Sequence, residues 1–259
     1  MLITGVSSSS NEIQPTWGAR HLEGQRDRLT VIVPVYNEED CLPHFKAEMD
    51  IFLLKSPLDA RILFVNDGST DRSQDFIANI CRVEKAYQSI SLGKNSGLST
   101  AIAAGIDGCD TSLVGYIDAD LQTTPIDFLK LLPFVPEYDM VNGIRKNRQD
   151  TIIKKMSSKI ANSFRKVVLS DGIEDSCCPL KIIKTDIAKK LPFFIGMHRF
   201  IPALVQLQGG LVKQVPVKHF PRYAGYAKYN LRNRLFWPFI DTMAVIWMKK
   251  RHLCYELKD

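Results

Sequence analysis

Short apolar strands alternate with amphipathic segments through the first half of this chain. Candidate strands begin at Thr30 with T-V-I-V-P-V-Y, occupy 61–66 with R-I-L-F-V-N, and follow near 89–92 and over 113–117. The segments between them predict helices over 38–54, 71–85 and 97–108. This alternation favours right-handed β-α-β units. A length of 259 residues suits one such domain, so we predict a Rossmann-like α/β fold with a mainly parallel sheet flanked by helices.

Polar residues at the end of the first strand are candidates for ligand binding, because open α/β sheets bind ligands at the carboxyl ends of their strands. Pro34 restricts strand pairing there. Tyr36, Asn37 and Glu38 then leave the sheet where a base or ribose could be held. The alternative is an ordinary helix entry, with Asn37 as the N-cap and acidic residues in the first turn.

The second strand ends in the motif V-N-D-G-S-T-D, residues 65–71. Asp67 stands at the strand tip as a hydrogen-bond acceptor, and Gly68 permits a tight turn. Ser69 or Thr70 can cap the helix that follows. A turn without function uses the same residue types, so the motif on its own leaves both interpretations open.

A third candidate is the motif G-K-N-S-G at 93–97, which places Lys94 between two glycines just before a predicted helix. The N-terminus of a helix binds anions, and a nearby lysine adds to this tendency. The motif is not a Walker phosphate-binding loop, because the spacing G-x-x-x-x-G-K-[ST] is absent. The segment therefore suits an anionic ligand held in some other way.

The strongest single feature is the motif Y-I-D-A-D-L-Q at 116–122. Asp118 and Asp120 follow an apolar strand two positions apart, so an extended backbone would project both to one side. Two such carboxylates repel each other unless a cation lies between them, and oxygen ligands suit Mg²⁺ or Mn²⁺. The alternative is a cap or an ion-pair partner. Thr124 and Pro125 then predict a helix start, as N-cap and first residue.

The charge of the chain is unevenly distributed. Residues 1–140 carry 11 Lys and Arg against 20 Asp and Glu, a balance of −9, whereas residues 141–259 carry 23 against 8, a balance of +15. Such a second half can meet phosphates, a lipid surface or nucleic acid, or can be a set of solvated helix faces. Nucleic acid is the weakest of these, because no aromatic platform is interleaved with the positive charge.

Targeting and redox signals place the protein in the cytoplasm. No run of about 18 uncharged apolar residues occurs, which argues against a membrane-spanning helix. The N-terminus lacks the basic flank of a secretory signal, and residues 1–28 are expected to form a mobile extension. Six cysteines lack the C-x-x-C spacing of a zinc site, so we expect thiols, including the adjacent Cys177 and Cys178.

The ordered motifs resemble those of inverting family 2 glycosyltransferases with the GT-A fold. They are V-I-V-P-V-Y-N-E-E, V-N-D-G-S-T-D, the segment that contains G-K-N-S-G, and Y-I-D-A-D-L-Q. The later segments G-I-R-K-N-R-Q-D at 143–150 and V-P-V-K-H-F-P-R-Y-A-G-Y-A-K-Y at 215–229 are similar to those of the polyprenyl-phosphate glycosyltransferases. That group includes dolichyl-phosphate mannose synthase and undecaprenyl-phosphate 4-deoxy-4-formamido-L-arabinose transferase. The resemblance covers roughly residues 30–235.

The resemblance implies a role for each polar cluster of the chain. Residues expected to hold the nucleoside are Pro34, Tyr36, Asn37, Glu38 and Asp67, with Lys94 close by. Residues expected to hold the metal and the diphosphate are Asp118, Asp120 and Gln122. Residues expected to face donor and acceptor phosphates are Arg145, Arg148, Arg222 and Lys228. Asp150 or Asp175 would orient the acceptor or act as base, and the alternative for Arg145 and Arg148 is an exposed turn.

Two positions depart from the pattern of the family. Asn66 stands where many relatives have an aspartate, which leaves the base of the nucleotide open. The segment E-D-S-C-C-P at 174–179 differs from the glycine-containing form of the arabinose-type enzymes, which leaves the sugar and the role of Asp175 open.

The function that follows is transfer of a sugar from a nucleotide-sugar, UDP-linked by expectation, to a polyprenyl phosphate such as undecaprenyl phosphate. The product would serve cell-envelope glycan synthesis or lipid A modification. A lipid phosphate is already ionised at neutral pH, so a strong base is less necessary than for a hydroxyl acceptor. The alternatives are transfer to a saccharide or lipopolysaccharide hydroxyl, and a non-catalytic scaffold that binds nucleotide-sugars.

The C-terminal segment predicts contact with a membrane surface. Residues 235–248 are apolar apart from Asp241 and Thr242, and cations flank them. As a helix they span about 21 Å, too short for a bilayer core of about 30 Å. We therefore divide the chain into an extension (1–28), a glycosyltransferase domain (29–228) and an amphipathic segment (229–259) on anionic lipid at the inner face of the cytoplasmic membrane. A core helix, a homo-oligomer contact or a membrane-protein partner are alternatives.

Overall fold

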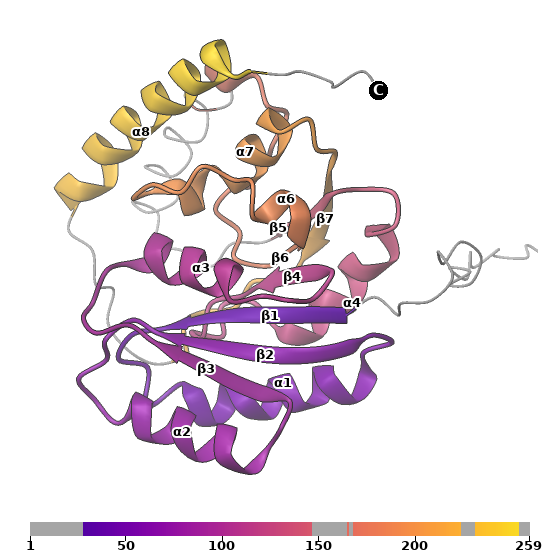
Figure 1. Ribbon diagram of the computed structural model, residues 1–259, viewed down its shortest axis with the longest axis vertical. Helices are drawn as coiled ribbons and strands as arrows, with labels where there is room; N and C mark the ends of the chain where they lie inside the picture. Colours follow the sequence, from indigo (N-terminus) through magenta and orange to yellow (C-terminus); the bar gives the residue numbers. More distant parts are fainter. Residues whose placement is uncertain (1–27, 147–164, 166–167, 224–230, 254–259) are drawn as a thin grey trace, which may run out of the picture.

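A seven-stranded sheet forms the centre of the protein, for which we analysed a computed structural model (Figure 1). The structure describes residues 28–146, 165, 168–223 and 231–253. The strands are β1 (Arg28–Val35), β2 (Asp59–Asn66), β3 (Tyr87–Ser91), β4 (Leu113–Tyr116), β5 (Met140–Arg145), β6 (Lys181–Lys184) and β7 (Val212–Val217). Their order in the sheet is β3-β2-β1-β4-β6-β5-β7, and β6 alone runs antiparallel to its neighbours. The predicted mainly parallel α/β sheet is confirmed.

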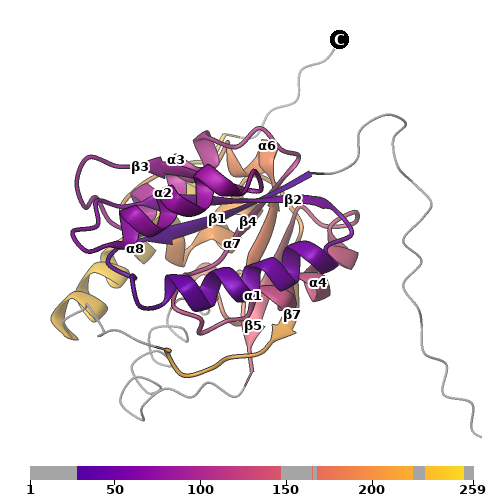
Figure 2. The ribbon, with the colours of Figure 1, turned by 90° about the horizontal axis from the view of Figure 1, so that it is seen from below.

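Helices cover both faces of this sheet (Figures 1 and 2). The helices are α1 (Leu42–Lys55), α2 (Ser73–Val83), α3 (Leu98–Asp107), α4 (Phe128–Leu131), α6 (Thr185–Ala188), α7 (Ile201–Leu207) and α8 (Leu231–Arg251). The short 3-10 turns are η1 (Pro125–Asp127), η2 (Leu132–Phe134) and η3 (Met197–Arg199). Helices α1 and α2 lie on one face of β1–β3, and α3 lies on the other (Figure 1).

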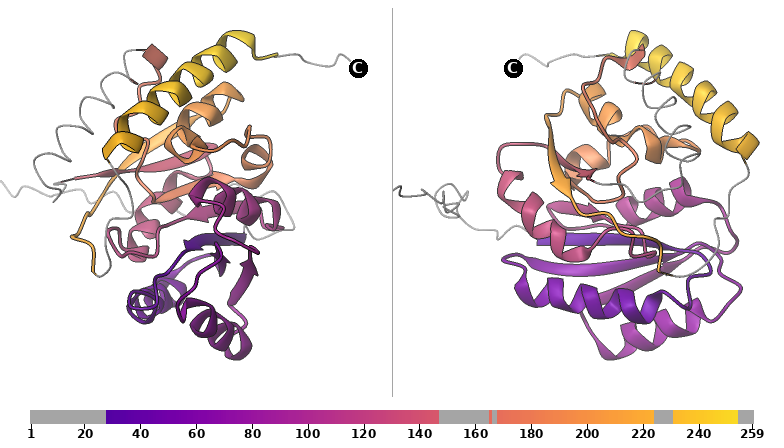
Figure 3. Two further views of the ribbon diagram at one scale, coloured as in Figure 1. Left: turned by 90° about the vertical axis from the view of Figure 1, so that its left-hand side faces the viewer. Right: turned by 180° about the vertical axis from the view of Figure 1, so that it is seen from behind.

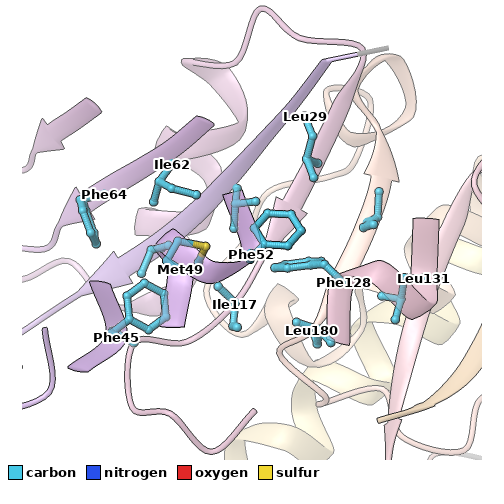
Figure 4. Packing of buried hydrophobic residues seen from close by; sticks show 14 of the residues in the cluster. Leu29, Phe45, Met49, Phe52, Ile62, Phe64, Ile117, Phe128, Leu131 and Leu180 are labelled. Carbon is cyan, nitrogen blue, oxygen red and sulfur yellow. The ribbon is translucent and has the colours of Figure 1, made fainter. Parts of the chain in front are cut away.

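The two-residue period of the strands divides the core between these faces. Leu29 and Ile62 point toward α1, where they join a cluster with Phe45 and Phe52 (Figure 4). Ile32, on the alternate side of β1, joins the second cluster with residues of α3 and α7. Because β1 and β4 are buried on both faces, their sequences are nearly continuous apolar runs, as expected for central strands of a parallel sheet.

The first helix begins later than predicted, and the reason is the backbone of the preceding loop. Asn37 adopts a left-handed conformation with φ of 52°, and α1 starts at Leu42 after an N-cap position at Cys41. The interpretation of Asn37 as N-cap is therefore wrong, and Glu38 and Glu39 precede the helix instead of opening it. The loop between β1 and α1 is longer than a simple cap, which leaves its polar groups available for other contacts.

Strand β6 joins the two halves of the sheet. Lys181 pairs with Tyr116 of β4 on one side and with Asn142 of β5 on the other. This insertion brings the segment that precedes β6 next to the end of β4, although more than 50 residues of sequence separate them. The sequence pattern of the first half gives no indication of this arrangement, because β6 is only four residues long.

Helix α8 lies on the side of α7, away from β1–β3 (Figure 3). Its inner side holds the buried Thr242 and Val245, and Asp241 forms an ion pair with Arg199 at 3.2 Å. Lys249 Nζ also donates a hydrogen bond to the carbonyl of Leu169 at 2.8 Å. Among the described helices, α8 included, none combines the length and the apolar character that crossing a membrane requires. The predicted boundary at residue 229 stays a prediction.

Candidate active site

The loops after β2 and β3 lie against each other at the carboxyl ends of these strands. The Asp67 carboxylate accepts hydrogen bonds from the backbone N–H groups of Ser96 at 2.7 Å and Gly97 at 2.8 Å. Gly68 has φ of 67°, and a Cβ there would lie 2.5 Å from the backbone nitrogen of Asn95. A glycine is therefore required at this turn, and Asp67 organises the start of α3. The exposed Lys94 side chain lies on the same loop.

Asn37 connects the loop after β1 to the loop after β2. Its side-chain oxygen accepts a hydrogen bond from the Thr70 backbone N–H at 2.8 Å, and its own backbone N–H donates to Ser69 Oγ at 3.0 Å. The sequence suggested that Ser69 or Thr70 caps α2, but neither does. The Asp71 carboxylate instead accepts a hydrogen bond from the Ser73 N–H at the start of this helix. Pro34, Tyr36 and Glu38 are partly exposed beside this contact.

The two aspartates of the central motif come together immediately after β4. Asp118 accepts a hydrogen bond from the Tyr116 hydroxyl at 2.6 Å, and Asp120 accepts one from the Gln122 backbone N–H at 3.1 Å. Burial, followed by the charge of Asp120, raises the pKa of the Asp118 carboxyl above its ordinary value. The backbone turns at this point, and Leu121 has φ of 57°. The predicted extended geometry is thus replaced by a turn, which still places both carboxylates at one site.

This carboxylate pair fits a divalent cation. Each charge disfavours the other, and a hard cation that accepts oxygen ligands relieves the repulsion. In the part of the chain that the structure describes, no group of three or more His, Cys, Asp and Glu side chains forms a complete metal cage. Mg²⁺ and Mn²⁺ suit an incomplete cage, because such ions keep water and phosphate oxygens as ligands. Gln122 contributes its backbone groups to the turn around Asp120.

The segment after β7 passes along this turn. Arg222 Nη2 lies 3.0 Å from Asp120 Oδ2, and Arg222 Nη1 lies 3.8 Å from Glu38 Oε1. The Tyr223 ring contacts the His44 ring on α1, and the two side chains share a hydrogen bond of 2.7 Å. Arg222 therefore joins the loop after β1 to the carboxylate pair. Its role toward a phosphate stays a prediction.

Arg145 and Asp175 form a buried ion pair beside the same site. Arg145 Nε and Nη2 each lie 2.8 Å from one oxygen of the Asp175 carboxylate, and the Arg145 backbone N–H donates to it at 3.2 Å. Burial acts to lower the pKa of Arg145, but the bonds and the charge of Asp175 outweigh it and raise the pKa. Arg145 was expected to bind a phosphate, and Asp175 was a candidate base. In the structure these two side chains bind each other.

Sequence reasoning missed a buried lysine under this ion pair. The Lys181 side chain is fully buried, and its Nζ donates hydrogen bonds to Asn142 Oδ1 at 2.6 Å and to the Ser176 carbonyl at 3.0 Å. Burial lowers the pKa of Lys181. These bonds hold the segment with Asp175, Ser176 and Cys177 against the sheet. A lysine inside the apolar run L-K-I-I was the one available signal.

Three predicted site residues lie outside the described residues. They are Arg148, Asp150 and Lys228. The roles assigned to them stay predictions, as do those of the residues placed above.

Comparison with known proteins identifies the family of this chain. The model of glycosyl transferase family 2 matches residues 30–192, which include every strand tip described above except the segment after β7. The chain belongs to glycosyl transferase family 2. Two undecaprenyl-phosphate 4-deoxy-4-formamido-L-arabinose transferases of Klebsiella pneumoniae, from strains MGH 78578 and 342, are 30% identical to this member over 205 residues. The match covers 78% of this chain and 63% of each relative.

Solved structures confirm the fold of this family 2 member. Glucosyl-3-phosphoglycerate synthase from Mycobacterium tuberculosis, in complex with Mn²⁺, UDP-glucose and phosphoglyceric acid, superposes with a TM-score of 0.64 at 12% identity, covering 86% of this chain and 79% of that chain. Mannosyl-3-phosphoglycerate synthase from Rubrobacter xylanophilus gives a TM-score of 0.64 at 18% identity, covering 90% and 77%. The predicted GT-A architecture is therefore confirmed.

Proposed function

We propose that this protein is an inverting glycosyltransferase that moves a sugar from a nucleotide-sugar, UDP-linked by expectation, to a polyprenyl phosphate such as undecaprenyl phosphate. The observation that carries the proposal is the position of Asp67 after β2 and of Asp118 and Asp120 after β4, at the same edge of the sheet of a family 2 chain. The names of the Klebsiella relatives support the lipid acceptor. The product would serve envelope glycan synthesis or lipid A modification.

On the donor side, the chain has to bind a diphosphate and stabilise it as it leaves. A bound Mg²⁺ or Mn²⁺ would supply positive charge to the diphosphate oxygens. Asp118 and Asp120 would hold that ion, while Arg222, at 3.0 Å from Asp120, is placed to bind a phosphate oxygen beside it. The guanidinium keeps its charge throughout, so it stabilises the leaving group without a proton transfer.

On the acceptor side, the Arg145–Asp175 ion pair favours a phosphate over a hydroxyl group. A hydroxyl acceptor needs a carboxylate base, and Asp175 is held by two charge-assisted hydrogen bonds. A phosphate acceptor is ionised already and needs positive charge and orientation instead. Transfer to a saccharide or lipopolysaccharide hydroxyl is the second candidate. It would require a base, which could be Asp175 after its ion pair with Arg145 is broken, or Asp150.

Helix α8 supports a position at an anionic membrane surface. Its outer side exposes apolar side chains, with Trp237 54% and Trp247 64% accessible. The other members of this outer face are Phe239, Ile240, Met243 and Ala244. Lys250 and Arg251 are exposed at its end. Aromatic side chains beside cations are typical of helices that lie in the interface of an anionic bilayer. We therefore propose peripheral binding at the inner face of the cytoplasmic membrane.

The test is transfer of label from a radiolabelled nucleotide-sugar to undecaprenyl phosphate in the presence of Mn²⁺ or Mg²⁺. We expect label in an organic-extractable lipid whose sugar is released by mild acid. Label in water-soluble glycan or in lipopolysaccharide would support the hydroxyl acceptor instead. Donor binding in calorimetry without transfer to any acceptor would support a nucleotide-sugar-binding scaffold and contradict the enzymatic proposal.

A further inference from the structure

The Tyr116 side chain contacts the carboxylate pair from inside the protein core. Tyr116 is the last residue of β4, where it pairs with Ile32 of β1 on one side and with Lys181 of β6 on the other. Its ring is 5% exposed and belongs to the second core cluster. The hydroxyl at the end of this ring donates a hydrogen bond of 2.6 Å to Asp118 Oδ1. No role assigned above uses this hydroxyl.

The contact between Tyr116 and Asp118 has a defined direction and a rigid base. The hydroxyl is the donor, because an ionised carboxylate can only accept hydrogen bonds. A buried phenol requires a partner for its hydroxyl, so the ring and the carboxylate hold each other in place. The backbone beside the ring is fixed as well, since the Ile117 N–H donates to the Ile32 carbonyl at 3.2 Å. The orientation of Asp118 is therefore coupled to the central strands of the sheet.

The carboxylate oxygens of the pair differ in their partners. Asp120 Oδ1 accepts a hydrogen bond from the Gln122 N–H at 3.1 Å, and Asp120 Oδ2 lies 3.0 Å from Arg222 Nη2. Asp118 Oδ1 is bound by Tyr116, whereas among the described residues no donor is bound to Asp118 Oδ2. The Tyr116 hydroxyl thus engages one oxygen of Asp118 and leaves the other for a cation.

A single available oxygen on Asp118 suits a small cation. Mg²⁺ requires nearly ideal octahedral geometry and binds to one or two carboxylates, and Mn²⁺ takes the same kind of octahedral oxygen site. Ca²⁺ accepts more oxygens in a flexible geometry, including both oxygens of one carboxylate. A hydrogen bond that keeps Asp118 Oδ1 away from the ion therefore favours the smaller cations.

We propose that Tyr116 is a positioning residue whose hydroxyl holds Asp118 with Oδ2 toward the cation, so that the site prefers Mn²⁺ or Mg²⁺ over Ca²⁺. The inference rests on the proposed function, because it requires Asp118 to bind the metal. The hydroxyl acts through Asp118 and does not touch the ion itself. Loss of a group that hydrogen-bonds a metal ligand typically weakens metal binding by about 10-fold to 100-fold.

The substitution Tyr116→Phe removes the hydroxyl and keeps the ring in its core cluster. Titration of the whole chain with Mn²⁺ alone, followed by electron paramagnetic resonance of the free ion, measures the affinity for Mn²⁺, and competition with Ca²⁺ measures the preference. We expect Tyr116→Phe to weaken Mn²⁺ binding about tenfold. The preference for Mn²⁺ over Ca²⁺ should fall by at least the same factor, because Asp118 can then turn both oxygens toward the larger ion.

Tyr87→Phe is the matched control. Tyr87 is also buried, and its hydroxyl donates a hydrogen bond to the Asp50 carboxylate. Tyr87 begins β3, so it lies at the edge of the parallel strands opposite to the carboxylate pair. Tyr87→Phe removes the same type of hydrogen bond and can lower the temperature of thermal unfolding, but it should leave the affinities for Mn²⁺ and Ca²⁺ unchanged.

A double-mutant cycle separates positioning from a general structural effect. Asp118→Asn removes the proposed metal ligand, so adding Tyr116→Phe to it should cause no further loss of Mn²⁺ binding. Additive losses would overturn the role of Tyr116 while leaving the proposed function intact. Wild-type selectivity in Tyr116→Phe, or equal losses for Mn²⁺ and Ca²⁺, would overturn it as well. If the folded wild type bound no Mn²⁺, the metal assignment of the proposed function would itself fall, and this inference with it.

Discussion

The two sides of the site are built by different kinds of contact. On the proposed nucleotide side, loops from adjacent β-α units bind one another through single carboxylate or amide groups, as Asp67 does with Gly97 and Asn37 with Thr70. On the proposed acceptor side, oppositely charged side chains pair with each other, as in Arg145 with Asp175. The first side resembles a preformed cradle of backbone groups. The second depends on buried charges that remain tolerable only while each retains its partner.

This difference predicts where each function resides. Loss of a group on the nucleotide side should remove ligand binding and leave the fold intact, because the loops are surface features of complete β-α units. Loss of a charged group on the acceptor side should reduce stability as well, since its partner would be left buried and unpaired. The predictions below follow this contrast from the largest expected effect to the smallest.

The largest effect is expected at the carboxylate pair. Asp120→Ala should lower the rate of sugar transfer by about 1,000-fold or more, because it would remove a proposed ligand of the cation that is proposed to stabilise the leaving diphosphate. Circular dichroism and thermal unfolding should remain close to wild type. Mn²⁺ binding, measured by calorimetry without donor, should weaken in parallel. The exposed Asp107→Ala is the matched control, and unchanged activity in Asp120→Ala would refute the metal assignment.

The second effect concerns stability on the acceptor side. Arg145→Ala leaves the Asp175 carboxylate buried without its partner and should lower the free energy of unfolding by about 3–5 kcal/mol. Denaturant titration measures this change. Arg28→Ala, which removes one member of the exposed ion pair with Asp59, should cost less than about 1 kcal/mol. Equal losses in the two variants would contradict the view that the acceptor side depends on buried charge pairs.

The third effect tests the outer face of α8. Replacing both Trp237 and Trp247 with Ser should reduce binding to phosphatidylglycerol-containing vesicles by about tenfold to 100-fold, because apolar area no longer enters the interface. Co-sedimentation with vesicles measures binding. Transfer to a water-soluble short-chain acceptor should change little. The exposed Leu54→Ser on α1 is the control, and a similar loss there would argue against a specific role for α8.

The smallest effect is a pH dependence of stability at His198. In the unfolded chain a histidine has a pKa near about 6.5, whereas burial and the charges of Arg199 and Lys181 lower the pKa of His198 to about 3 in the folded protein. Below about pH 6.5 the unfolded state therefore binds more protons, and stability falls as the pH falls toward the folded pKa. His198→Asn should lose about 1 kcal/mol less than wild type between about pH 7 and pH 5.5. His252→Asn, an exposed control, should behave like wild type.

The strands and helices of the first half could be predicted because their signals are local. The apolar run at 61–66 indicates a strand, and the turn residue Gly68 indicates where that strand has ended. The caps were predicted less well. Asn37 and Thr70 have the residue types of helix caps, yet they bind each other across two loops because the folded sheet brings their loops together. Residue type alone does not tell a cap from a loop contact.

The sequence by itself determined the α/β class, the family and the edge of the sheet at which Asp67, Asp118 and Asp120 lie, because the carboxyl ends of parallel strands are at one edge of a sheet. The tertiary structure decided how the charged groups are used. It placed β6 between β4 and β5, so that the Asp175 carboxylate forms an ion pair with the Arg145 guanidinium. The physical reason is that a buried charge requires a partner, and which partner it finds depends on distances that no local pattern encodes.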